Sequence, residues 1–209
     1  MTGTTPHATD YAWLREQHDG LLEGYCVTLV DAITPARLLE ELGAAPGIRV
    51  TGVPALFEPA FEFWDRQDDG DDGDDEMFVG VAALDGWAVM VEIHGCVGVT
   101  SSVMGPVSKG RTVVSHCRNI NAVDHFTWLA DGELLLHFEP LFPSLRDGSG
   151  ADRFLTEMRE SGFEPDEERT SAHRPTESAF ALAERITGIR LTAGRFGSLE
   201  FVCGAVRAG

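Results

Sequence analysis

The chain has 209 residues, 43% of them hydrophobic, and a formal net charge of −18 at pH 7. This length and apolar fraction suffice for a buried core, and no apolar run approaches the ~18 residues that a membrane span needs. The negative charge argues against nucleic-acid binding, because affinity for a phosphate backbone comes from clustered Lys and Arg. It favours a basic partner instead.

The N-terminal residues 1–9 are small and polar, and we expect them to be mobile, followed by a single domain over 10–209. They contain no basic and apolar export signal, so we expect a cytoplasmic protein. The four cysteines have no close spacing and three lie in apolar runs, which is typical of buried thiols in a reducing compartment.

The first half of the chain alternates strand and helix signals. Residues 25–30 (YCVTLV) predict a buried strand, and Thr34-Pro35 predicts a helix that ends at Gly43. Residues 48–53 predict a further strand, and the aromatic segment 54–64 predicts a helix.

An acidic run, DRQDDGDDGDDE, occupies residues 65–76. Its spacing matches part of an EF-hand loop, with Asp65, Gln67, Asp69, Gly70 and Glu76 at the ligand and glycine positions. However, position eight is Asp72 instead of an aliphatic residue, and a strand pattern follows. We therefore interpret residues 65–76 as a solvated acidic loop.

Two Asp-Gly pairs predict β-hairpins, since this dipeptide readily adopts positive φ at both central positions of a two-residue turn. Asp85-Gly86 pairs Ala82 with Val89 and Leu84 with Trp87. Asp131-Gly132 pairs the strands on either side of it. The fold class that we predict is α+β, with a mostly antiparallel sheet built around these hairpins and helices packed on it.

The second hairpin also predicts which side chains share a face. A regular register opposes Trp128 to Leu135 and Phe126 to His137. One face would then carry Leu129, Leu134, Leu136 and Phe138, and the other Phe126, Trp128 and Leu135. Both faces would be apolar, as expected of a ribbon covered on both sides.

The last third of the chain predicts helices over residues 101–108, 151–161 and 175–187 and a final strand over 199–206. Gly162 and Gly188 are natural helix stops. We expect the final strand to join the sheet near an edge.

His94, Cys96, His116 and Cys117 have the ligand types that zinc prefers. Adjacent strand residues point to opposite faces, so His116 and Cys117 would not reach one ion. We expect no metal site and no other cofactor.

Polar residues within apolar strands mark candidate binding positions. Buried polar groups need hydrogen-bond partners, and a buried acid must find a partner or shift its pKa. These residues either complete structural networks or line a pocket. The candidates are Glu92, Arg118, Asn119, Asn121, Glu139 and Arg146.

Several ordered motifs resemble a family of small, uncharacterised actinobacterial proteins, whose function is unknown. They include Gly24-Tyr-Cys-Val-Thr, Asn119-Ile-Asn-Ala-Val123 and Phe138-Glu-Pro-Leu-Phe-Pro143. In that family position 139 is usually aspartate, and the acidic run 65–76 resembles an insertion.

No nucleophile elbow, phosphate-binding loop or other named catalytic motif is present in the sequence. We therefore expect a non-catalytic module that binds a protein or peptide, of a regulatory, adaptor or immunity-like kind, through an acidic and aromatic surface. One alternative is a small enzyme with a polar pocket near Asn119, Asn121 and Glu139. A second alternative is a structural subunit of a complex.

Overall fold

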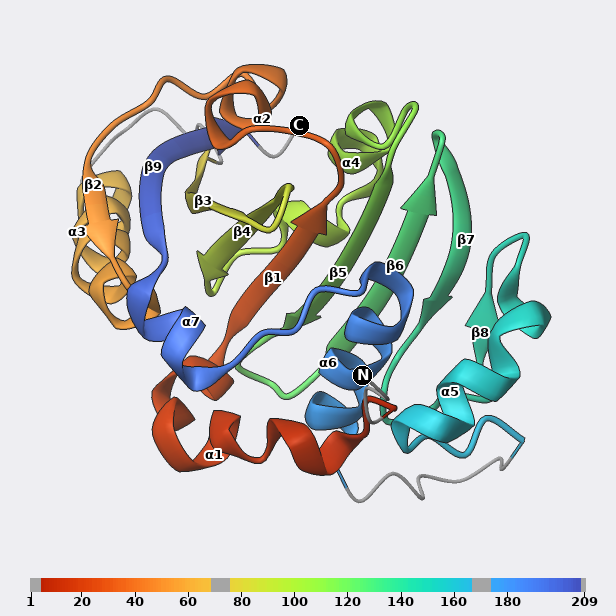
Figure 1. Cartoon of the computed structure of the whole chain (residues 1–209). Helices are drawn as coiled ribbons and strands as arrows, with labels where there is room; N and C mark the ends of the chain where they lie inside the picture. The colour runs from red at the N-terminus through yellow and green to blue at the C-terminus, as the bar shows by residue number, and fades with distance from the viewer. Residues whose placement is uncertain (1–4, 69–75, 167–173, 208–209) are drawn as a thin grey trace.

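The computed structural model describes residues 5–68, 76–166 and 174–207 (Figure 1). Within these ranges, nine strands form one open, entirely antiparallel sheet in the order β2-β9-β3-β4-β1-β5-β6-β7-β8. The strands are β1 (Tyr25–Val30), β2 (Arg49–Thr51), β3 (Glu76–Leu84), β4 (Trp87–Ile93), β5 (Thr112–Arg118), β6 (Asp124–Ala130), β7 (Glu133–Phe138), β8 (Arg146–Asp147) and β9 (Glu200–Arg207).

Seven α-helices of the described residues pack on this sheet. They are α1 (Trp13–Gln17), α2 (Pro35–Glu41), α3 (Phe57–Asp68), α4 (Ser101–Val107), α5 (Leu155–Ser161), α6 (Pro175–Thr187) and α7 (Ala193–Ser198). The larger hydrophobic cluster contains side chains of α1, α3, α5, α6 and α7, whereas α2 and α4 cover the other face (Figure 1). The predicted α+β class is confirmed.

Strand β1 lies at the centre of the sheet, between β4 and β5. All six of its residues are buried, which explains why its sequence is nearly continuous in apolar residues instead of alternating. The candidate site residues lie on strands next to β1 or near the far edge.

Both Asp-Gly hairpins are present, with Asp85 and Asp131 at φ of 51° and 52°. The first has the predicted register, in which Ala82 faces Val89 and Leu84 faces Trp87. The sequence thus predicts this turn correctly because both central residues adopt positive φ readily.

The register of the second hairpin is wrong beyond Leu129–Leu134. A bulge at Leu135 opposes Trp128 to Leu136 and Phe126 to Phe138. The extra residue is held from outside the hairpin, since the Gly150 N–H donates to the Leu135 carbonyl at 2.9 Å. Leu136 and Phe138 therefore join the face of Phe126 in the larger core, not the face of Leu129.

Two other predicted segments are partly described. Residues 69–75 of the acidic run and residues 1–4 lie outside the described ranges. Asp65 and Gln67, at two positions of the calcium pattern, belong to helix α3, so the loop begins later than residue 65. Near the N-terminus, Ala8 is buried, and the Arg185 Nε donates to the Pro6 carbonyl at 2.9 Å.

Among the described residues, no helix has both the length and the hydropathy that crossing a bilayer requires.

Candidate functional site

Five of the six predicted site residues lie at one end of the sheet. Arg118 ends β5, Asn119 and Asn121 lie in the loop before β6, Glu139 follows β7, and Arg146 begins β8. The sixth, Glu92, lies inside β4 on the other side of β1. The contacts of each residue decide whether it supports the fold or faces a ligand.

Arg118 neutralises a buried carboxylate. Its Nη1 lies 2.8 and 3.0 Å from the two carboxyl oxygens of Asp124, and its Nε donates to the Leu22 carbonyl at 3.1 Å. Asp124 has no exposed surface, and this burial raises its pKa to about 6 despite the opposing effect of Arg118. The guanidinium of Arg118 is thus occupied by Asp124 and by the Leu22 carbonyl at the end of β5.

Behind this ion pair lies a buried histidine. His116 Nδ1 is 2.8 Å from the Tyr25 hydroxyl, while its Nε2 is 3.9 Å from the nearer Asp124 oxygen and has no hydrogen-bond partner. Burial and the nearby Arg118 lower the pKa of His116 to about 3, so the ring is neutral at pH 7. The void beside it measures about 10 Å³, room for at most one water molecule and for no substrate.

Asn119 shapes the loop between β5 and β6. Its Oδ1 accepts from the backbone N–H of Asn121 at 2.9 Å and of Val123 at 3.0 Å. Such side-chain bonds to nearby backbone are typical of asparagine in turns. Asn121 is exposed and contributes its backbone N–H to this turn. Asn119 is therefore structural, as one of the two interpretations from sequence had it.

Arg146 anchors the segments that follow β7. It donates to the carbonyl of Pro143 at 3.3 Å, to the carbonyl of Pro165 at 2.8 Å and to the carboxylate of Asp152 at 2.8 Å. Glu139 is half-buried, and its charge contributes to the raised pKa of Asp124. This end of the sheet is closed by its own side chains.

Glu92 is fully buried, and its two carboxyl oxygens accept from the backbone N–H groups of Val97 and Gly98, at 2.8 and 2.9 Å. Burial raises its pKa to about 7, although both hydrogen bonds act in the opposite direction. Glu92 thus caps the short helical turn after β4, and none of its surface is exposed.

The zinc hypothesis has no support in the described residues, which contain no group of three or more His, Cys, Asp and Glu side chains able to hold an ion. Cys117 is buried and its thiol lies 3.4 Å from the Gly95 carbonyl. His116 contacts the Tyr25 hydroxyl, and His94 packs against Trp64 instead.

An aromatic cluster on α3 is the feature that sequence reasoning missed. Phe61, Trp64 and His94 contact one another, with ring centroids 5.8 Å (Phe61–Trp64), 5.4 Å (Trp64–His94) and 6.1 Å (Phe61–His94) apart. Phe57 packs against Phe61 at 6.3 Å. Phe61 remains 46% exposed although α3 buries Ala60 completely.

Three carboxylates line the solvent side of the same helix. Glu58, Glu62 and Asp65 are exposed, and none of them forms an ion pair or hydrogen bond through its carboxylate with another described residue. We define the α3 aromatic surface as Phe57, Phe61, Trp64 and His94 together with these three acids. Helix α3 lies at the outer flank of the molecule, next to β9 and β2 (Figure 1).

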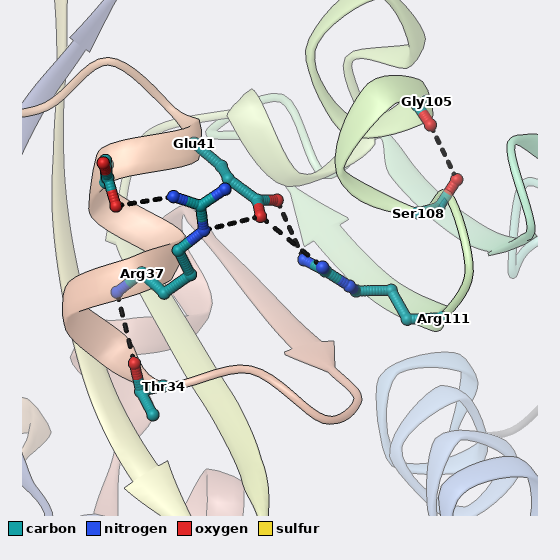
Figure 2. A network of polar contacts seen from close by, with 7 residues as sticks. Thr34, Arg37, Glu41, Gly105, Ser108 and Arg111 are labelled. Carbon is teal, nitrogen blue, oxygen red and sulfur yellow. Dashed lines mark hydrogen bonds and ion pairs between the residues drawn. The ribbon is translucent and has the colours of Figure 1, made fainter.

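Some carboxylates elsewhere on the surface, among them Glu41, Asp152 and Glu160, are paired with arginines of the chain itself. Figure 2 shows Glu41 of α2 between Arg37 and Arg111, with Arg37 Nε at 3.1 Å and Arg111 Nη1 at 2.8 Å from its carboxyl oxygens. Glu58, Glu62 and Asp65 have no such internal cation among the described residues. Their charge remains available to a partner.

A groove of about 320 Å³ follows the other flank of α3, between this helix and β9. Phe63, Phe78 and the 53%-exposed Ile48 give it an apolar lining, with Glu62 and Arg66 at its rim. Both flanks of α3 therefore expose apolar side chains.

The sequence indicated only the part of the aromatic cluster that lies on helix α3. Phe57, Phe61 and Trp64 follow the i, i+4, i+7 spacing of one helix face, a pattern that is also typical of a buried stripe. His94 is 30 residues further along, and only the fold brings it to α3.

No curated protein and no solved structure matches the sequence. A family model described as "Family of unknown function (DUF6461)" matches residues 4–208, which is nearly the whole chain. The chain therefore belongs to the DUF6461 family, a family of unknown function.

Proposed function

We propose that this chain is a binding protein that recognises a basic protein or peptide through the α3 aromatic surface. The observation that carries the proposal is the contact of Phe61 and Trp64 on helix α3 with His94 after β4, next to Glu58, Glu62 and Asp65, which have no partner among the described residues. Exposed aromatic residues that cluster on a surface are typical of interaction sites, whereas single exposed apolar residues are common everywhere.

The charge of the chain supports a basic partner. With 34 acidic and 16 basic side chains, the molecule attracts cationic surfaces over distances of about a Debye length. This attraction accelerates encounter more than it adds affinity. The aromatic rings would then supply most of the contact energy.

The enzyme alternative is less well supported. The perturbed carboxylates Glu92 and Asp124 are both fully buried, and the space beside His116 is too small for a substrate. A general acid or base must reach its substrate within hydrogen-bond distance. A regulatory or adaptor role needs no such opening.

Affinity capture from an extract of the native host tests the proposal. The tagged chain is compared with a Phe61→Ser/Trp64→Ser double variant, with Leu145→Ser as control, because Leu145 is 75% exposed and lies outside α3. We expect the wild type and the control to retain a basic protein that the double variant loses, and less of it at high salt.

Folding of each variant is checked by thermal melting before capture. Equal retention of the same proteins by all three chains would contradict the proposal. A partner that stays bound in equimolar amount at high salt would instead identify the chain as a permanent subunit of a complex.

A further inference from the structure

We propose that the α3 aromatic surface binds an arginine side chain of its partner, with the guanidinium stacked on the face of Phe61, beside Trp64, and paired with Glu58 or Asp65. This inference rests on the proposed function and specifies its chemistry. It is carried by the ring geometry, by the positions of Glu58 and Asp65 along the helix and by the lack of partners for these two acids among the described residues.

The rings provide an exposed face at a fixed angle. Phe61 and Trp64 meet edge to face at 89°, and the His94 ring is inclined to them by 56° and 64°. Each ring is thus supported by the other two, and Phe61 remains 46% exposed. Cations are attracted to the face of an aromatic ring, and indole is the strongest of the natural rings.

His94 is itself held in place, which fixes the cluster. Its φ is 56°, and its N–H donates to the Gly24 carbonyl at 3.0 Å. The imidazole rests on Gly24, where no side chain intervenes. A preorganised ring loses little conformational freedom when a ligand binds.

Glu58 and Asp65 lie next to Phe61 on the surface of helix α3. Glu58 precedes Phe61 by three residues and Asp65 follows it by four, and such positions are adjacent on a helix surface. A cation on the face of Phe61 would therefore have a carboxylate on either side along the helix. Both acids are exposed and unpaired among the described residues.

Arginine fits this arrangement better than lysine does. The planar guanidinium can stack on an aromatic face while its edge donates to a carboxylate, whereas an ammonium is a compact and strongly hydrated charge. The chain forms the arginine–carboxylate part of this pairing internally, since Arg37 and Arg111 both bind Glu41 (Figure 2).

Titration with short peptides tests this inference without a known partner. The probes are acetyl-Arg-Arg-Arg-amide, its lysine counterpart and its citrulline counterpart, in which a neutral urea replaces each guanidinium. The readout is the indole N–H signal of each of the four tryptophans in ¹H–¹⁵N NMR spectra. Trp64→Phe assigns the signal of Trp64.

We expect the arginine peptide to shift the Trp64 signal saturably and more than those of Trp13, Trp87 and Trp128. The lysine peptide should bind more weakly, and the citrulline peptide should leave Trp64 unshifted. The double variant Glu58→Gln/Asp65→Asn should weaken arginine binding roughly fivefold. Glu133→Gln removes an exposed charge outside α3 and should have little effect.

An unshifted Trp64 signal, or equal shifts with the arginine and citrulline peptides, would overturn the inference. Capture of a partner that depends on Phe61 and Trp64 would in that case still support the proposed function, with the rings making apolar contacts. Conversely, arginine binding at Trp64 without any captured protein would support the inference and contradict the proposed function.

Discussion

The imidazole of His94 rests directly on the Cα of Gly24, so a Cβ at position 24 would overlap its Nδ1. Gly24 has an extended backbone, with φ of 177°, and it is the space above it, not its conformation, that requires glycine. Gly24 thus leaves room for the His94 ring, which also contacts Phe61 and Trp64 of α3.

We predict that Gly24→Ala displaces His94 and lowers the free energy of unfolding by about 1–3 kcal/mol, the usual cost of overpacking. Urea denaturation measures this loss, and the Trp64 indole signal should move because its neighbour has moved. The control is Gly20→Ala, since no atom lies within 4 Å of a Cβ built at Gly20. A stable Gly24→Ala variant with an unchanged Trp64 signal would contradict the prediction.

Removing Arg118 should be costly because it leaves the buried Asp124 carboxylate without its counter-charge. For Arg118→Ala we expect a loss of about 3–5 kcal/mol at pH 8. The pKa of Asp124 is already raised to about 6, and losing Arg118 would raise it further, so the loss should be smaller at pH 5, where Asp124 takes up a proton. Arg37→Ala, which removes the ion pairs of an exposed arginine with Glu40 and Glu41, should cost far less than Arg118→Ala. Equal losses for the two variants at pH 8 would show that Asp124 does not depend on Arg118.

Glu92 should make folding stability decrease as pH rises. Its pKa is about 7 in the folded state and 4.5 ordinarily, so within this window the folded chain retains a proton that the unfolded chain has released. Stability is therefore greatest below the window and falls through it, by roughly 3 kcal/mol for this shift.

The difference in free energy of unfolding between wild type and Glu92→Leu isolates this contribution. Measured from pH 4.5 to 8, the wild type should lose stability relative to the variant through about pH 7, and the difference should level off as the pH approaches 8. A difference independent of pH throughout would refute the shift. The comparison also cancels the opposite contribution of His116, whose lowered pKa favours folding at higher pH.

Asn119 and Asn121 should respond differently to alanine. Asn119→Ala removes the oxygen that accepts from two backbone N–H groups, and we expect a loss of about 1–2 kcal/mol. Asn121→Ala leaves both bonds in place and should change stability by less than about 0.5 kcal/mol. Thermal melting of the two single variants decides the matter. Larger destabilisation by Asn121→Ala would reverse the assignment.

The sequence predicted local structure well where local chemistry determines it. Thr34 caps α2 through its hydroxyl, and α6 has the predicted bounds Pro175–Thr187, with Gly188 in the left-handed conformation. In each case the start or stop signal is the residue directly next to the helix.

Errors arose where a distant segment intervenes. The bulge at Leu135 is stabilised by a bond from Gly150, 15 residues later, so the hairpin alone gives no sign of it. Likewise, Arg118 and Glu92 are polar residues in apolar strands, but their partners Asp124, Val97 and Gly98 were not assigned from sequence. The sequence identified these residues by their polarity. Only the fold showed that their hydrogen bonds and ion pairs are made within the chain.

The two outermost strands of the sheet bear on how the molecule behaves at high concentration. β2 has three residues and β8 has two, although strands inside the sheet have up to nine. An exposed strand edge offers unpaired N–H and C=O groups on which another chain can assemble, and short edge strands limit this. The sheet therefore ends, on both sides, in a form that discourages edge-to-edge aggregation.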